Sequence, residues 1–332
     1  MKLIDSLKFC SWAVAKKNFV ESLTHFKISG GRIQSFNGSI SLSSPIDLNL
    51  DCQPIAAKFL KTIQSCSDTV QITMTPAGKL SIKSGNTRAL VDCTQEPFPE
   101  ILPEGPEMPV SGAFIEALAL LEPMIAEDAS RPWARGILFT GNRAYATNNV
   151  ILAQVELDGT FAHPINIPHA AVNELLRIKK YPSHMQLAEN SVTFHYDDGR
   201  WLRTALLSVE WPDLNRVLNP DPMPTTFVKL EDEFWQALED LKIHVDEYRR
   251  IRVVPNYLTT SLDHENASYS KVNGMPKCDA SFNIDMLLML KGIATSIDFN
   301  SYPAPCLWVG EEGLRGAIVG MRDQDGTSNS PT

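Results

Sequence analysis

The sequence predicts an α+β fold made of three similar domains. Three stretches of the 332-residue chain repeat one pattern, in which a helical stretch is followed by alternating strands and a proline-rich join. Each repeat also has an amphipathic helix in its front half, which would cover one face of the strands. A chain of this length exceeds what one hydrophobic core usually serves. We therefore expect domains at 1–105, 106–220 and 221–322, joined near Pro103 and Pro220, and a polar, disordered tail at 323–332.

The elements of each repeat follow from the spacing of apolar residues. Front helices are expected over 11–26, 111–124 and 230–244, and second helices over 55–63, 170–178 and 284–291. Strands are expected over 70–74, 79–83, 88–91, 185–187, 191–196, 202–207, 296–299, 306–309 and 316–322. In the middle repeat, strands at 136–139 and 151–153 flank a turn at 140–142 and a corner at 146–149, and residues 197–199 form a hairpin turn.

Bulk composition indicates a folded protein of the cytoplasm. Hydrophobic residues at 43% and charged residues at 21% are ordinary for a globular chain. No apolar run approaches the roughly 20 residues that a membrane helix needs. The N-terminal segment, with Asp5 so early, does not resemble a signal peptide. Six scattered cysteines without a C-x-x-C pair favour free, buried thiols over a disulfide scaffold or a zinc site.

No motif predicts catalysis. The seven histidines lack H-E-x-x-H spacing, and the sequence contains neither a phosphate-binding loop nor a G-x-S-x-G elbow. We therefore predict no catalytic residue, no metal and no cofactor. An enzyme with an unrecognised site is a remaining alternative, which activity lost on changing a carboxylate or a histidine would favour.

The net charge of −9 bears on nucleic-acid binding. Proteins that hold DNA by affinity usually carry a basic excess, because neutralised phosphates supply most of the binding energy. A ring that encloses the duplex escapes this requirement, since its retention is topological. Net charge alone therefore does not exclude DNA as a partner.

Three segments, taken together, resemble one family. Arg131, the run 136–139 and Ala146-Thr147-Asn148, followed by Leu152-Ala153, occur in an order similar to the second domain of bacterial sliding clamps, the beta subunits of DNA polymerase III. Residues 212–217, Pro-Asp-Leu-Asn-Arg-Val, match the family's Pro-Asp-Tyr-Arg-Arg-Val. Residues 317–322, Ala-Ile-Val-Gly-Met-Arg, match its final Val-Val-Met-Pro-Met-Arg.

This resemblance implies a peptide-binding groove and no catalytic chemistry. Partners of clamps insert a short apolar peptide between the second and third domains. The groove would comprise Ala134, Thr147, Asn149, Val150, Ile151, Leu152, Pro212, Arg216, Val217, Ala317, Val319, Gly320, Met321 and Arg322. Taken one at a time, these residues would be ordinary strand core, linker and surface cations, so it is their joint order that predicts a groove.

The sequence also departs from the family pattern. Val150-Ile151 replaces the usual His-Arg and makes the groove floor more apolar, Gly320 replaces a proline, and Asn215 replaces an arginine. Ten residues follow Arg322, where the family typically stops one residue later. These departures bear on which peptide motif fits. Shortness and divergence suggest a phage or mobile-element source.

Basic residues on helix faces, and one loop with a cation and an aromatic, are candidates to face DNA, through phosphate contacts without base specificity. The basic residues are Lys16, Lys17, Lys58, Lys61, Arg131, Arg177 and Lys180, and the aromatic of the loop is Trp133. The alternative is that they are only solvated helix faces.

The sequence therefore predicts a processivity clamp. Two copies would close head to tail around double-stranded DNA, and the DNA polymerase and the clamp loader would bind through short hydrophobic peptides. The alternative from another class is a noncatalytic, β-rich repeat protein with a scaffolding role that never encircles DNA.

Overall fold

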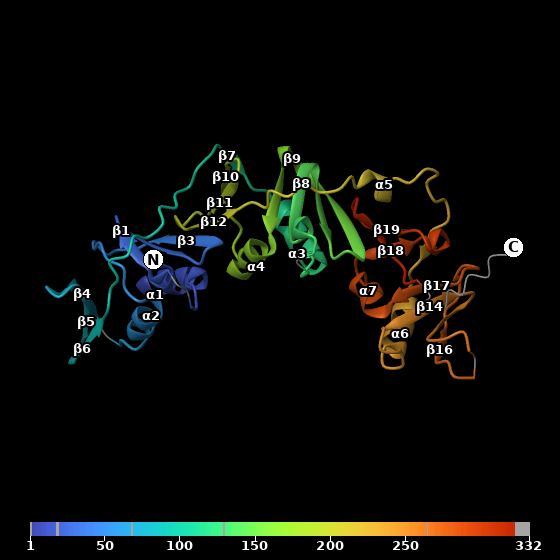
Figure 1. The fold of residues 1–332 in the computed structure, drawn as a ribbon, viewed down its shortest axis with the longest axis horizontal. Coiled ribbons are helices and arrows are strands. Elements are labelled where there is room, and N and C mark those ends of the chain that lie inside the picture. The colour runs from blue at the N-terminus through green and yellow to red at the C-terminus, as the bar shows by residue number, and fades with distance from the viewer. Residues whose placement is uncertain (1, 18–19, 68, 129, 264, 323–332) are drawn as a thin grey trace. The chain divides into compact units, whose positions relative to one another are not determined.

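The computed structural model describes residues 2–17, 20–67, 69–128, 130–263 and 265–322 (Figure 1). The fold is α+β with antiparallel sheets, as predicted. The chain divides into two compact units: unit 1 comprises Met1–Ile115 and Ile167–Ser208, and unit 2 comprises Glu116–Asn166 and Val209–Thr332. The tail expected at 323–332 lies outside the described residues.

Unit 1 is organised around a seven-stranded antiparallel sheet. Its helices are α1 (Leu3–Cys10), α2 (Ala56–Gln64) and α4 (His169–Ile178), with 3₁₀ turns η1 (Ser11–Ala13) and η2 (Glu21–Thr24). Its strands are β1 (Lys27–Ser29), β2 (Arg32–Phe36), β3 (Ile40–Pro45), β4 (Val70–Met74), β5 (Leu80–Ser84), β6 (Thr87–Val91), β7 (Glu107–Pro109), β10 (His184–Leu187), β11 (Ser191–His195) and β12 (Trp201–Ala205). The large sheet has the order β1-β2-β3-β12-β11-β10-β7, and β4-β5-β6 form a separate sheet.

Unit 2 is organised around a six-stranded sheet. Its helices are α5 (Asn215–Leu218), α6 (Asp232–Leu241) and α7 (Ile284–Met289), with 3₁₀ turns η3 (Glu122–Met124), η4 (Pro132–Ala134) and η5 (Phe299–Ser301), while α3 (Gly112–Leu121) begins in unit 1. Its strands are β8 (Gly136–Thr147), β9 (Ile151–Pro168), β13 (Val228–Lys229), β14 (Arg250–Val254), β15 (Tyr257–Thr259), β16 (Tyr269–Lys271), β17 (Ala280–Asn283), β18 (Ala294–Ile297), β19 (Cys306–Gly310) and β20 (Arg315–Ile318). The six-stranded order is β13-β18-β19-β20-β9-β8, and a second sheet has the order β16-β15-β14-β17.

Helix periodicity explains how the cores form. In α2, Ala56, Phe59 and Ile63 are spaced by three and four residues and are buried, so that Phe59 meets Phe26 edge to face at 6.4 Å. In unit 2, Phe282 and Phe234 both pack against the buried ring of Phe299. Each unit therefore has its own apolar core.

The two large sheets share one strand order. From β2 the first runs β2-β3-β12-β11-β10-β7, and from β8 the second runs β8-β9-β20-β19-β18-β13. In each sheet, a corner joins two strands. The second of these strands pairs with the last strand of the following repeat. Strands from the predicted middle repeat, 106–220, therefore belong to both sheets. Two compact units are compatible with a threefold repeat for this reason, and the three domain boundaries stay a prediction.

Most predicted elements are confirmed within a few residues. The second helices correspond to α2, α4 and α7, and the strands after them to β4–β6, β10–β12 and β18–β20. Helix α3 begins after Ser111, whose Oγ accepts a hydrogen bond from Phe114 N–H at 3.3 Å, as expected of an N-cap. The hairpin turn at 197–199 is also present, with Gly199 at φ +78°.

One prediction in the repeats is wrong. The first helix spans Leu3–Cys10, and the described part of 11–26 holds 3₁₀ turns and the isolated bridge of His25 in place of a helix, because the apolar spacing that is buried against the sheet belongs to Leu7 and Cys10. The assigned strand β8 runs through 140–142 to Thr147, and Gly141 takes a left-handed conformation (φ +55°) within it, so the turn expected there stays a prediction.

Candidate functional site

One face of the six-stranded sheet carries an apolar cluster. The buried side chains of Leu138, Tyr145, Leu152 and Leu218 pack together, and the half-buried side chains of Trp211, Leu214 and Val217 lie against them. We call these seven residues the apolar cluster. It lies wholly within unit 2.

Leu138 and Tyr145 both belong to β8 and to the apolar cluster. They are seven residues apart, so strict alternation along a straight strand would point them to opposite faces of the sheet. Between them, Gly141 takes a left-handed conformation (φ +55°), which a regular strand does not adopt. A simple period-two pattern therefore does not predict that both side chains reach the same cluster.

The connecting segment 211–218 covers this face. The ring of Trp211 packs edge-on against Trp133, with 4.9 Å between centroids. The backbone N–H groups of Val217 and Leu218 both donate to Leu214 O, which forms the short turn of α5. Beyond it, Asn219 Oδ1 accepts a hydrogen bond from Arg315 Nη1 at 3.1 Å. The segment is therefore attached to β20 at its end.

The corner between β8 and β9 is fixed by side-chain hydrogen bonds. Asn148 Oδ1 accepts from the N–H groups of Val150 and Ile151 at 3.1 and 2.8 Å, and Asn149 takes φ +74°. Val150 O in turn accepts from Val319 N–H at 2.9 Å. The predicted corner is confirmed, and it brings two of the three matched segments together.

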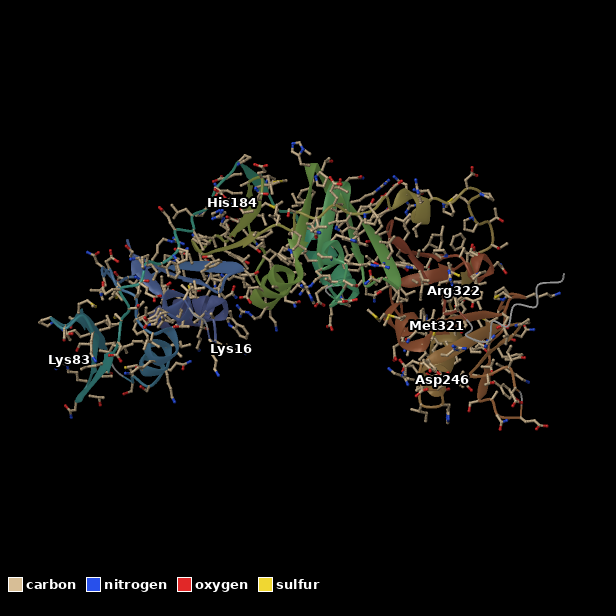
Figure 2. The ribbon with its side chains drawn as sticks, in the orientation of Figure 1. Lys16, Lys83, His184, Asp246, Met321 and Arg322 are labelled. Atoms are coloured by element: carbon tan, nitrogen blue, oxygen red, sulfur yellow. The ribbon has the colours of Figure 1, made fainter. Side chains whose placement is uncertain are left out.

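The end of the described chain is held by unit 2. Met321 N–H donates to Ser281 O at 2.7 Å, and Tyr302 OH donates to Met321 O at 2.6 Å; Figure 2 labels Met321 and Arg322. A Cβ on Gly320 would lie 2.5 Å from the ring of Tyr302 and 2.8 Å from Ser281 O. Only glycine fits there without a shift of Tyr302 or the backbone.

The predicted groove residues fall into three classes of exposure. Ala134, Thr147, Ile151, Leu152 and Ala317 are buried, whereas Asn149, Val150, Val217, Gly320 and Met321 are half-buried. Pro212, Arg216, Val319 and Arg322 are exposed. Ile151 has no exposed surface, so it supports this site only from within the core. The predicted list does not contain Trp211 and Leu214, although both flank Pro212-Asp213, nor Tyr145, which a period-two pattern from Leu138 places on the opposite face.

Cations surround the apolar cluster. Arg131 Nη1 donates to Asn149 Oδ1 at 3.1 Å, and the guanidinium of Arg216, 89% exposed, lies 3.9 Å from Asp213. A cavity of about 450 Å³ at Asn219, where the connecting segment ends, is lined by Arg143 and Arg315, with Glu156 as the acid among the described lining residues. An apolar surface with a positively charged rim suits a peptide that carries apolar and acidic side chains.

Three of the seven predicted DNA-facing cations, Lys58, Arg177 and Lys180, have acidic partners. Lys58 and Lys79 both bind Asp92, at 3.4 and 2.6 Å, and their hydrogen bonds lower the pKa of this carboxyl. Lys180 binds Asp198 at 2.9 Å, and Arg177 binds Glu174 while it stacks over Trp12 at 4.0 Å.

The remaining members of that set differ in their surroundings. Lys16, Lys17 and Lys61 are exposed, and in the described ranges of the chain none of them forms an ion pair (Figure 2 labels Lys16). Trp133 is half-buried against Trp211, and its carbonyl accepts a hydrogen bond from Asn166, so it belongs to the apolar cluster's surroundings. Exposed Arg131 lies beside the corner.

The described residues contain no group of three or more His, Cys, Asp or Glu side chains that could hold a metal ion. All six cysteines are free, as predicted, and burial raises the pKa of the Cys52 thiol to about 12. Within the described ranges, no helix is long and apolar enough to cross a membrane.

Solved structures with the same fold cover nearly the whole chain. The DNA polymerase sliding clamp of Caulobacter crescentus superposes with a TM-score of 0.82 at 19% identity, over 97% of each chain. The chain has the sliding-clamp fold. A sliding clamp of Pseudomonas aeruginosa bound to griselimycin gives 0.77 at 17% identity, over 97% of each chain. The Helicobacter pylori beta clamp bound to a DNA ligase peptide gives 0.76 at 15% identity, over 97% of this chain and 98% of that one.

Comparison of the sequence alone with protein-family models and with curated proteins finds no match. The resemblance to DNA polymerase III beta sliding clamps, first drawn from three short segments, is confirmed at the level of the fold.

Proposed function

We propose that this chain is a DNA polymerase processivity factor that acts in the cytoplasm as a sliding clamp. Two copies close head to tail into a ring around duplex DNA, with three domains from each. The observation that carries the proposal is the sliding-clamp fold over 97% of the chain. A ring needs no catalytic group, in keeping with the lack of any catalytic motif in the sequence.

The distribution of charge supports enclosure as the mode of DNA retention. Basic residues slightly outnumber acidic ones in unit 1, and the acidic excess of the chain is concentrated in unit 2. Exposed Lys16, Lys17 and Lys61 are the cations we assign to DNA phosphates, because they have no competing acid among the described residues. Such a surface binds DNA weakly, so topological closure supplies the retention.

Partner peptides are assigned to the apolar cluster and its rim. Polymerase and clamp loader would place apolar side chains against Val217, Val319 and Met321, and Arg216 and Arg322 would orient the peptide. The Helicobacter pylori clamp bound to a DNA ligase peptide gives precedent for a peptide ligand on this fold. The apolar surface of unit 2 supplies the matching chemistry here.

Retention on circular DNA tests the proposal. The protein is incubated with nicked circular DNA and the clamp loader of its host, and bound protein is isolated by gel filtration in high salt, which weakens phosphate contacts. We expect protein to remain on circles and to be lost after linearisation. Equal retention on both forms, or none on circles, would reject enclosure and favour the noncatalytic scaffold.

A further inference from the structure

The corners of the two large sheets are structural counterparts. In unit 1, Asn37 Oδ1 accepts hydrogen bonds from the N–H groups two and three residues ahead, at 3.0 and 2.9 Å. In unit 2, Asn148 Oδ1 accepts from the same relative positions, at 3.1 and 2.8 Å. Both corners join two strands of the common strand order.

Strand register extends this correspondence. Four residues after Asn37, Ser41 pairs with Arg203, and four residues after Asn148, Leu152 pairs with Ala317. The partner strands both follow a left-handed glycine with φ +78°, at Gly199 and Gly313. The two sheets are therefore matched residue by residue here.

The connecting segments across these sheets also correspond. Phe98-Pro99-Glu100-Ile101 in unit 1 and Trp211-Pro212-Asp213-Leu214 in unit 2 both read aromatic, proline, acid, aliphatic. Gln34 Nε2 donates to Ile101 O at 2.8 Å, which holds the first segment over the sheet. The apolar cluster of unit 2 thus has a counterpart position in unit 1.

The chemistry of that position has diverged. Where unit 2 has Leu152 and Ala317, unit 1 has Ser41 and Arg203, and Arg203 forms an ion pair with Glu104 and donates to Ser191 at 3.1 Å. This part of unit 1 is therefore polar and internally paired. The apolar side chains of Trp201 and Leu102 lie on the other side of the connecting segment 98–101.

There, a cavity of about 570 Å³ opens against the sheet. Its apolar lining includes Trp201, Phe98, Ile101 and Leu102, and Leu102 is 58% exposed. A volume of several hundred Å³ with aromatic walls is typical of a site for a small ligand or a peptide side chain. All of its lining residues belong to unit 1.

The polar wall of this cavity favours an anion. Arg32 Nε donates to Ser43 Oγ at 3.0 Å and its Nη2 donates to Gly199 O at 2.9 Å, and among the described residues it has no carboxylate partner. Lys27 lines the same cavity, paired with Asp51 at 2.6 Å. Glu100 is the acid among the described lining residues, so cations exceed acids there. A ligand carboxylate would complete the pairing of Arg32.

We propose that this cavity is a second peptide site, in which an extended segment of a partner protein places an apolar side chain against Trp201 and Phe98 and a neighbouring carboxylate on Arg32. Its apolar and polar parts are arranged differently from those of the apolar cluster. The proposal rests on the geometry of unit 1 and does not require the chain to encircle DNA.

The test follows the indole N–H resonance of Trp201 in the full chain, assigned with the variant Trp201→Phe. The probe is the tripeptide Ac-Asp-Leu-Phe-NH₂, compared with Ac-Asn-Leu-Phe-NH₂. We expect the Asp peptide to shift the Trp201 signal with a Kd on the order of 1 mM, and the Asn peptide to bind about tenfold more weakly, since it lacks the charge.

Two variants and one control make the outcome specific. Arg32→Gln should bind the two peptides equally, whereas Arg88→Gln should keep the preference, because Arg88 likewise donates its Nε to a serine at 3.0 Å but does not line the cavity. Leu102→Asp changes an exposed residue outside the sheet, and it should weaken the binding of both peptides.

Equal affinity of the wild-type chain for the two peptides would overturn the proposal, as would an unchanged Trp201 signal or a preference that survives Arg32→Gln. A duplex oligonucleotide that shifts the Trp201 signal where the peptides do not would also overturn it, and would assign the cavity to nucleic acid. Loss of retention on DNA circles, by contrast, concerns only the proposed function.

Discussion

At the scale of single residues, Gly320 is determined by its neighbours. The ring of Tyr302 occupies the space that a Cβ would need, and the Tyr302 hydroxyl binds the carbonyl of Met321. The glycine at the position where the sequence departs from the family pattern is therefore matched to Tyr302, which lies earlier in the same C-terminal region. The sequence shows the departure at Gly320, but the contact that requires it is visible only in the fold.

This contact makes Gly320→Ala destabilising. We expect a loss of about 2 kcal/mol in the free energy of unfolding, because the ring or the backbone must move. Urea unfolding followed by circular dichroism measures it. Gly159→Ala is the matched control, since no atom lies within 4 Å of its added Cβ and its φ is ordinary. Equal effects of the two substitutions would contradict the steric account.

Asp198 gives a second prediction at this scale. Burial raises the pKa of this carboxyl, but hydrogen bonds from Arg200 and Lys180 outweigh it and hold the pKa below its usual value of 3.8. A depressed folded-state pKa means that the stabilisation is complete above the unfolded pKa and is lost as pH falls through the folded pKa.

We therefore expect Asp198→Asn to lower the free energy of unfolding by about 2 kcal/mol at pH 7, and the difference from the wild type to shrink below roughly pH 4. Unfolding by urea at pH 7 and pH 3 measures both values. Asp197→Asn, at the exposed neighbouring position of the same turn, should change little at either pH. A pH-independent difference for Asp198→Asn would show that its ionisation is not the cause.

At the scale of elements, the connecting segment 211–218 determines the apolar cluster. Its side chains cover a sheet face on which Leu138, Tyr145 and Leu152 would otherwise be exposed, and Leu218 completes the buried part. Val217 remains half-buried and within reach of a ligand. A peptide bound here would bury it further, which is the physical basis for the proposed site.

Val217→Asp should therefore weaken peptide binding to unit 2. Loss of valine burial and the added charge predict a Kd for Ac-Asp-Leu-Phe-NH₂ that is raised more than about tenfold, followed by the indole resonance of Trp211. Val209→Asp is the matched control, because Val209 is 44% exposed in the same connection and lies outside the apolar cluster. Unchanged binding by Val217→Asp would remove this surface from the peptide site.

Much of the fold could be predicted from local patterns, and the failures have physical causes. The second helices and their following strands have clear periodicity, so α2, α4 and α7 were predicted closely. Helix α1 was missed because the spacing at 11–26 resembles a helix, while burial against the sheet selects Leu7 and Cys10. Leu138 and Tyr145, seven residues apart in β8, join one cluster across the left-handed Gly141, which a pattern of fixed period cannot represent.

The candidate site could be predicted only in part. The order of the matched segments predicts that the corner, the connecting segment and the last strand lie together. The Val319–Val150 hydrogen bond confirms this for the corner and the last strand. Exposure could not be predicted, since Ile151 and Val319 look equally apolar although one is buried and the other is 43% exposed. Ion pairs such as Lys180–Asp198 depend on tertiary distance and were likewise not foreseen.

At the scale of the whole molecule, one chain carries the same sheet order twice, with the acidic excess concentrated in unit 2. Repetition suits a ring, because equivalent modules joined by equivalent contacts turn the chain by a constant angle. Tight affinity for DNA is not needed in such an assembly, and the overall acidity of the chain then has no cost for function.

Solution mass measured together with small-angle X-ray scattering tests enclosure most directly. The account predicts a particle of twice the 36.9 kDa chain mass, whose distance distribution shows a central hole wide enough for a double helix. A particle that stays at the mass of one chain at all concentrations, or a dimer without such a hole, would contradict it.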